Sequence, residues 1–243
     1  MRWKTATKPT GDFSSRSNVE ENWINDTPVK ILSVQIGRPR PVNFDSHMTR
    51  TGIYKSPVRG PVRVGTLNLE GDEQADLTVH GGVNKAVYAY PSEHYGFWRQ
   101  QYPAFELEWG AFGENLTTEG LLEVEAGIGD MVQIGTAQLV VVQPRLPCYK
   151  LAGKFGDKNI LQTFTNSGRS GIYFAVVEEG HLQSGDSITW KSRGTFPFTI
   201  ADAMRLYNGQ ELPSQMLDRA LELKALPDSW HRMILEARTR KKI

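Results

Sequence analysis

The chain is organised around the stretch Leu139-Val140-Val141-Val142-Gln143-Pro144-Arg145-Leu146-Pro147-Cys148-Tyr149-Lys150. Its four opening apolar residues predict a buried strand, and the proline after Gln143 predicts the exit from that strand. Cys148 is the single cysteine of the 243 residues and lies just beyond the strand end, where folds commonly place chemistry. Basic neighbours favour a thiolate, which attacks electrophiles and binds soft metals. The plainer alternative is a small buried hydrophobe, since free cysteine is among the most buried residue types.

Strand patterns extend outward from this stretch in both directions. Gly129-Asp130 and Gly185-Asp186 each introduce an alternating segment, and residues 172–177 form another apolar run. Residues 29–36 alternate with a one-residue shift, which predicts a β-bulge. Short strands with Gly and Pro punctuation are also predicted at 51–57, 61–64, 67–72 and 74–82. Together they predict a closed or nearly closed, mostly antiparallel barrel with inserted helices.

Helical patterns occur in two places. Residues 92–102 carry aromatic side chains at helical spacing, and Ser92 is a suitable N-cap. From residue 195 the period becomes helical, and Thr199 with Asp202 three residues on predicts a capping box. We therefore expect an α+β protein, mainly β, with a polar tail at 1–28, a barrel domain at 29–194 and a three-helix subdomain at 195–243.

The composition of the chain excludes several classes of protein and of metal site. The net charge of +1 argues against a general nucleic-acid or membrane-surface binder, and 39% hydrophobic residues suffice for a core. A single cysteine excludes an internal disulfide, a Cys-rich zinc site and an iron–sulfur cluster held by this chain alone. We find neither a run of about 18 apolar residues nor a secretory signal, and we expect a cytoplasmic protein.

Several bases lie at predicted strand exits or in Gly-rich loops and could line one anion-binding pocket with Cys148. They are Lys55, His80, Lys85, Arg145 and Lys150. A single base of this kind is more often a solvated surface charge, and His80 is explained equally well as a hydrogen-bonded structural histidine. A Walker loop and a dinucleotide-binding glycine fingerprint are absent from the sequence.

Five ordered motifs carry a resemblance to a known family. They are Gly71-Asp72-Glu73-Gln74-Ala75-Asp76, His80-Gly81-Gly82-Val83-Asn84-Lys85-Ala86-Val87, Phe112-Gly113-Glu114-Asn115-Leu116, Gly129-Asp130 and residues 143–151. In this order they resemble a MOSC domain of the YiiM type over residues 29–235, and residues 226–230 resemble that group's C-terminal three-helix extension. Asn84 stands where an aspartate is expected, which leaves the role of the neighbouring Lys85 open.

The resemblance implies a barrel that binds the molybdenum cofactor (molybdopterin), with Cys148 as the protein ligand to molybdenum. Cofactor contacts are then expected from Thr51, Lys55, His80, Lys85, Asn115, Arg145 and Lys150. It also implies reduction of N-hydroxylated compounds such as 6-hydroxylaminopurine to amines, a detoxification in which His80 is the candidate proton donor. Electrons are expected from an external reductase, and a homodimer stays open. Two rivals remain: a carrier of cofactor or sulfur without turnover, and a metal-free cysteine hydrolase that uses Cys148 and His80.

Overall fold

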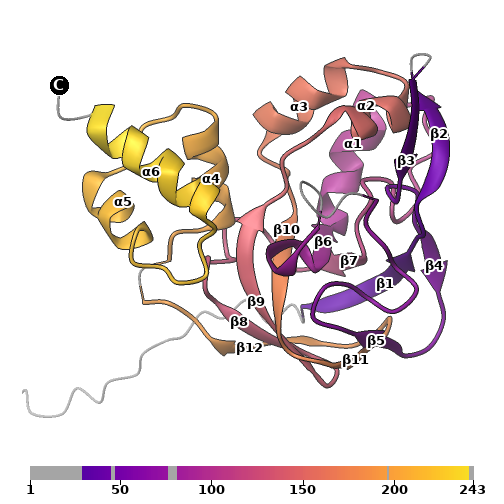
Figure 1. The fold of residues 1–243 in the computed structure, drawn as a ribbon, viewed down its shortest axis with the longest axis horizontal. Helices are drawn as coiled ribbons and strands as arrows, with labels where there is room; N and C mark the ends of the chain where they lie inside the picture. Colours follow the sequence, from indigo (N-terminus) through magenta and orange to yellow (C-terminus); the bar gives the residue numbers. More distant parts are fainter. Residues whose placement is uncertain (1–28, 45–46, 76–80, 196, 241–243) are drawn as a thin grey trace, which may run out of the picture.

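An eight-stranded sheet forms the centre of the protein (Figure 1). A computed structural model of the chain describes residues 29–44, 47–75, 81–195 and 197–240. In sheet order the strands are β12 (Ile188–Ser192), β8 (Met131–Ile134), β9 (Ala137–Pro144), β10 (Ile172–Glu178), β6 (Val87–Pro91), β7 (Leu116–Glu119), β1 (Lys30–Ile36) and β4 (Ser56–Val58). Two antiparallel pairs accompany it: β5 (Val62–Val64) with β11 (Gly180–Leu182), and β2 (Arg40–Phe44) with β3 (His47–Thr51).

The α+β class is confirmed, but the sheet of the described residues is not closed into a barrel. Its pairs are antiparallel except for β6 with β7, which run parallel. Two partners share one edge of β1. The last three residues of the strand pair with β4, and its first residue bridges to Ser187, just before β12. Only its beginning reaches the far end of the sheet, through the isolated bridge between Lys30 and Ser187 and a 2.7 Å bond from the Ile188 N–H to the Val29 carbonyl. The three residues of β1 that pair with β4 cannot also pair with β12, so the contact between β1 and β12 stays short and the sheet is not closed.

The sheet separates two cores, and strand β6 contributes to both. Val87 and Ala89 belong to the larger core, whereas Tyr88 and Tyr90 point into a smaller aromatic core. Burial on both faces explains the continuous apolar run of this strand. The aromatic core is covered by α1 (Tyr95–Gln101), α2 (Tyr149–Phe155) and α3 (Asn159–Ser167). The larger core is extended by α4 (Ile200–Tyr207), α5 (Ser214–Ala220) and α6 (Asp228–Arg240), which form a separate group in Figure 1.

The helix boundaries test the predicted caps. The capping box is confirmed: the Thr199 side chain accepts from the Asp202 N–H at 3.1 Å, and the Asp202 carboxylate accepts from the Thr199 N–H at 3.1 Å. The N-cap predicted at Ser92 is wrong, because Ser92 opens the 3-10 turn η2 (Ser92–His94) and α1 begins only at Tyr95, without a side-chain cap. Helices α2 and α3 were not individually predicted. Each helix ends at a glycine that adopts a positive φ. A glycine that follows a short amphipathic segment is a helix-end signal that the sequence contains.

The strands predicted at 51–57 and 67–72 need correction, whereas the bulge predicted within 29–36 is confirmed. Residues 67–72 form a bend and a turn, with one isolated bridge between Val64 and Leu69. The register of β1 against β7 shifts between Ile31 and Ser33, as the bulge prediction requires. The strand predicted at 51–57 is wrong, because β3 ends at Thr51 and β4 begins at Ser56 with irregular backbone between them. Much of the strand predicted at 74–82 lies outside the described residues.

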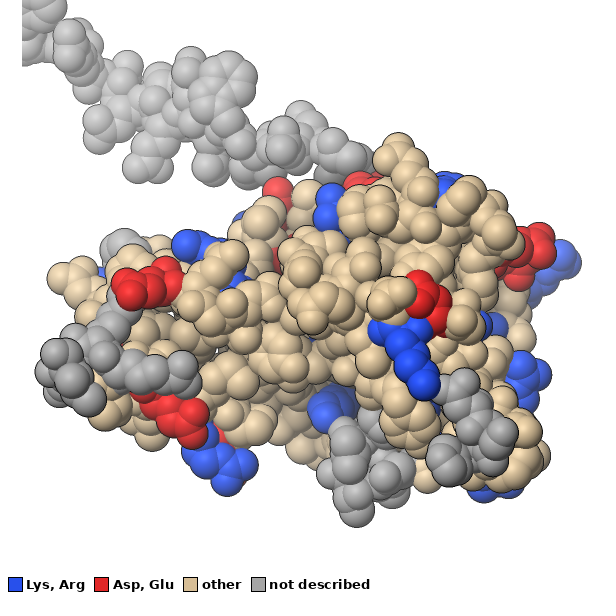
Figure 2. Space-filling model, turned by 90° about the horizontal axis from the view of Figure 1, so that it is seen from above, with Lys and Arg blue, Asp and Glu red and all other residues tan. Residues whose placement is uncertain are grey.

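Charged side chains are interspersed on the surface. On the face shown in Figure 2, Lys and Arg do not gather into a patch of one sign, in keeping with the net charge of +1. Within the described ranges, no helix is long and apolar enough to cross a membrane.

Candidate functional site

A single cleft brings the predicted site residues together. Its lining includes every described member of the predicted set: Thr51, Lys55, Lys85, Asn115, Arg145, Cys148 and Lys150. His80 lies outside the described residues. These residues come from segments up to about a hundred positions apart, so the cleft exists only in the folded chain.

Arg145 is the most informative cation of the cleft. It follows Pro144, the last residue of β9, and its side chain is buried against Tyr88 and Phe164, with the guanidinium 5.3 and 5.4 Å from the two ring centroids. Its Nη1 has no hydrogen-bond partner within the described part of the chain. Burial alone would lower the Arg145 pKa, but the nearby tyrosines and Cys148 raise it overall. A buried donor without a partner is costly, which indicates a place for an anionic ligand.

Cys148 lies at the amino end of α2, on the wall of the same cleft. Its side chain is partly exposed, and its carbonyl accepts from the Leu151 N–H at 2.8 Å, which begins the helix. Burial lowers the pKa of Lys85, and the charge of the Cys148 thiolate offsets part of that shift. The thiol therefore shares the electrostatic environment of Lys85 and Arg145.

The floor of the cleft is an internally bonded polar network. Lys55 forms an ion pair with Asp72, and both side chains are almost fully buried. Asp72 also accepts from the Gly37 N–H at 2.7 Å and from Asn115 Nδ2 at 2.9 Å. Burial lowers the pKa of Lys55, and Asp72 offsets part of this. The side-chain oxygen Oδ1 of Asn115 accepts from the Tyr88 N–H at 3.1 Å, so Lys55 and Asn115 line the cleft while also holding its floor together.

Lys154 is a charged residue behind the cleft that the sequence analysis missed. Its ammonium group donates to the carbonyls of Ile53 at 3.3 Å and Gly110 at 2.9 Å, and so joins α2 to two loops of the cleft. Burial lowers the Lys154 pKa to about 8 despite the attraction of Glu114. It lies one helical turn after Lys150, a spacing that would have revealed it had α2 been predicted.

Comparison with known proteins agrees with this architecture. The MOSC domain family matches residues 76–189, and the YiiM-like, 3-alpha helix domain matches residues 198–236. The uncharacterised protein YflK of Bacillus subtilis is 39% identical over 210 residues, which cover 86% of this chain and 95% of YflK. The chain belongs to the YiiM-like MOSC-domain family.

Two further relatives extend the family comparison. The crystal structure of YiiM from Geobacillus stearothermophilus superposes on this YiiM-like chain with a TM-score of 0.72 and 32% identity, covering 87% of this chain and 100% of that one. A Gibberella moniliformis protein named "Reductase" is 30% identical over 199 residues, 81% of this chain but 35% of that longer protein. MOSC domains are associated with binding of the molybdenum cofactor.

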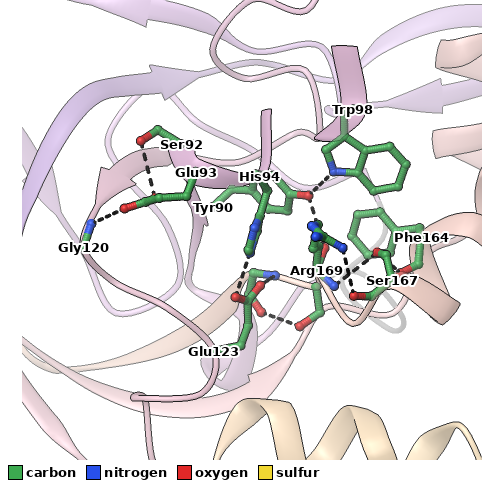
Figure 3. Close-up of polar contacts among 12 residues, drawn as sticks. Tyr90, Ser92, Glu93, His94, Trp98, Gly120, Glu123, Phe164, Ser167 and Arg169 are labelled. Carbon is green, nitrogen blue, oxygen red and sulfur yellow. Dashed lines mark hydrogen bonds and ion pairs between the residues drawn. The ribbon is translucent and has the colours of Figure 1, made fainter. Parts of the chain in front are cut away.

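A second polar network of this YiiM-like protein lies beside the aromatic core, away from the predicted residues (Figure 3). His94 Nε2 and the Glu123 carboxylate are 2.8 Å apart, and the other Glu123 oxygen accepts from the Gly171 N–H at 2.7 Å. Glu123 is thereby bonded to both η2 and the turn before β10. Sequence spacing alone carried no signal for this pair, because its members lie 29 positions apart.

That turn supports Arg145 indirectly. The Tyr90 hydroxyl donates to the Arg169 carbonyl at 3.2 Å, and the Tyr88 hydroxyl donates to the Ser170 carbonyl at 2.8 Å. The Tyr88 ring is one of the two on which the Arg145 guanidinium stacks. The network in Figure 3 therefore helps to fix the wall that orients the guanidinium.

The donor set of the cleft fits the cofactor that is associated with MOSC domains. Cys148 offers one soft sulfur ligand, and Arg145 offers a buried donor suited to a phosphate oxygen. No group of three or more His, Cys, Asp or Glu side chains in the described ranges could hold a metal ion by itself. One thiol next to a cationic pocket matches a metal that arrives with an anionic organic ligand.

Proposed function

We propose that this protein is a molybdenum-cofactor-dependent reductase that converts N-hydroxylated compounds, such as 6-hydroxylaminopurine, to amines. The observation that carries the proposal is the buried Arg145 Nη1, which has no hydrogen-bond partner in the described structure and shares its cleft with the single cysteine. Family membership supports a cofactor of this class, and the Gibberella relative named "Reductase" supports the reaction type.

In this proposal different residues of the cleft bind the metal and the phosphate of the cofactor. Cys148 would ligate the metal through its thiolate, and Arg145, Lys85 and Lys150 would bind the phosphate by charge-assisted hydrogen bonds. Lys55 and Asn115 would shape the floor through the bonds described above. Thr51 would contribute through its hydroxyl, which accepts from the Ile53 N–H at 3.2 Å. Bound there, the cofactor supplies a two-electron redox couple.

The overall reaction consumes two electrons and two protons. The N–O bond breaks, the oxygen leaves as water, and the nitrogen remains as the amine. We propose an external reductase as the electron source, because one cysteine cannot hold an electron-relaying cluster and the sequence carries no dinucleotide fingerprint. His80 is the proposed proton donor, since histidine exchanges protons near neutral pH.

Three measurements on the full chain, expressed in a host that makes the cofactor, test the proposal. Molybdenum and pterin per chain are determined first, followed by turnover of 6-hydroxylaminopurine with an artificial electron donor, and then with NADH or NADPH alone. We expect bound cofactor, turnover with the artificial donor, and no turnover with nicotinamide alone. Cofactor without reduction of any N-hydroxylated compound would favour the carrier role, and activity of metal-free protein would favour the hydrolase.

Two variants assign the residues. Cys148→Ser should fold, lose activity and lose molybdenum, whereas full molybdenum content with full turnover would refute its role as ligand. Arg145→Met should lower the pterin content sharply. Arg63→Met is the matched control, because Arg63 lies on β5, is exposed and pairs with Glu179 outside the cleft. Equal cofactor content in both arginine variants would contradict the proposed phosphate contact.

A further inference from the structure

A chain of two hydrogen bonds connects the C-terminal helices to the turn that contains a lining residue of the cleft, Lys85. Trp230 of α6 donates its indole N–H to Gln143 Oε1 at 3.1 Å, across 87 positions of sequence. The Nε2 of the same Gln143 donates to the backbone carbonyl of Asn84 at 3.0 Å. Trp230 is 2% exposed and Gln143 6% exposed, so neither bond is exchanged freely for bonds to water.

The receiving end of this chain is a short turn whose side chains are not buried. The 3-10 turn η1 (Val83–Lys85) contains no buried residue, and its N-terminal neighbour Gly82 has a positive φ of 88°. Backbone bonds from Lys85 to Gly82 and from Ala86 to Phe174 hold its ends. The turn carries Lys85 into the cleft, so the bond from Gln143 to Asn84 fixes a segment that side-chain burial does not fix.

Glutamine is the side chain that this position needs. Its amide accepts from the indole with its oxygen and donates to the carbonyl with its nitrogen; glutamate lacks that donor and methionine lacks both groups. The contact to residue 84 uses the backbone carbonyl. The departure from the family pattern at Asn84 therefore does not remove this bond.

We propose that Trp230 and Gln143 are positioning residues through which the three-helix region holds Lys85 beside Cys148. Trp230 does not itself line the cleft, and its effect passes through the Gln143 amide to the Asn84 carbonyl. The inference deepens the proposed function, because it assigns a role in cofactor binding to the C-terminal helices.

Hydrogen exchange on the full chain without cofactor tests the positioning directly. In Trp230→Phe and Gln143→Met, amide exchange in a peptide that contains Lys85 and Ala86 should accelerate about five- to tenfold, the factor that one net hydrogen bond represents. The matched control is Ile234→Val, which lies one turn further on α6, is fully buried and is not part of the chain of bonds. It should accelerate exchange in α6 but leave the peptide with Lys85 unchanged.

Cofactor content provides the second readout, through a double-mutant cycle with Lys85→Met. Trp230→Phe and Lys85→Met should each lower pterin per chain, and the double variant should fall no further than Lys85→Met alone. The inference would be overturned if amide exchange at Lys85 were unchanged in both Trp230→Phe and Gln143→Met. It would also be overturned if the losses of pterin in the double-mutant cycle were additive. If Trp230→Phe fails to fold, Gln143→Met alone decides. Wild-type protein without any molybdenum would refute the proposed function, while the exchange result would still decide the positioning.

Discussion

Replacing Lys154 by methionine should change how stability depends on pH. The ammonium group of Lys154 is buried between α2 and two loops of the cleft, and burial lowers its pKa from the ordinary 10.5 to about 8. Methionine keeps an unbranched side chain of similar length but carries no charge. It leaves two backbone carbonyls without this donor, a cost that does not vary with pH.

The lowered pKa of Lys154 gives the direction and the size of the change in unfolding free energy with pH. Between about pH 8 and 10.5 the folded protein has lost the Lys154 proton while the unfolded chain still binds it, so the free energy of unfolding rises with pH across that window. A difference of about 2.5 pKa units corresponds to about 3 kcal/mol, and about 2.5 kcal/mol of this is regained between about pH 7 and 10. The wild type should therefore gain about 2.5 kcal/mol relative to Lys154→Met over that range.

Equilibrium urea unfolding of both proteins at a series of pH values measures this difference. Subtracting one curve from the other removes the contributions of titrating groups that do not interact with Lys154, such as the buried tyrosines. Lys191→Met is the matched control, because Lys191 is exposed on β12, and its curve should parallel the wild type. Parallel curves for wild type and Lys154→Met would refute the argument that burial penalises this ammonium group.

Three further predictions concern stability and can be measured by thermal or urea unfolding. Asp72→Asn should cost about 3 to 5 kcal/mol because it leaves a buried ammonium group without its carboxylate, whereas Asp218→Asn, in an exposed pair, should cost far less; equal losses would contradict this. Thr199→Ala should cost about 1 kcal/mol through loss of the capping box, and no change would show that the cap is dispensable. Gly113→Ala should destabilise more than Gly156→Ala, since both glycines have positive φ but a Cβ at 113 would lie 2.9 Å from an isoleucine side chain and one at 156 would meet nothing within 4 Å; a larger loss at 156 would refute the clash.

Much of the local structure was predictable from the sequence. The alternating pattern of β1 included its bulge, and Thr199 with Asp202 marked the start of α4 correctly. Such features depend on residues within a few positions of one another, so a local pattern is sufficient to reveal them. The short helix α2 was missed because its seven residues span only about two helical turns, which is too short to show a clear amphipathic pattern.

The candidate site was predictable as a set of residue types but not as a geometry. The single cysteine and its basic neighbours pointed to an anion-binding cleft, and the fold does gather them there. Which cations already have internal partners was decided by tertiary contacts: Lys55 pairs with Asp72, whereas Arg145 keeps one nitrogen without a partner among the described residues. Burial and bonding depend on every neighbour in space, and a local sequence window contains only a few of them.

The overall topology and the connection between the two regions were decided by tertiary structure alone. The alternation of strands predicted a sheet, yet whether it closes depends on how β1 shares one edge between β4 and β12. Likewise, a tryptophan in an amphipathic helix predicts a core residue, and only the fold aims its N–H at Gln143, 87 positions earlier. The sequence by itself therefore indicated most of the strands, the start of α4 and a set of candidate site residues, whereas α2, α3 and the irregular backbone between Thr51 and Ser56 emerged only in the structure. The pairing of segments across long separations was settled by packing, because a hydrogen bond between distant segments leaves no periodic trace in either of them.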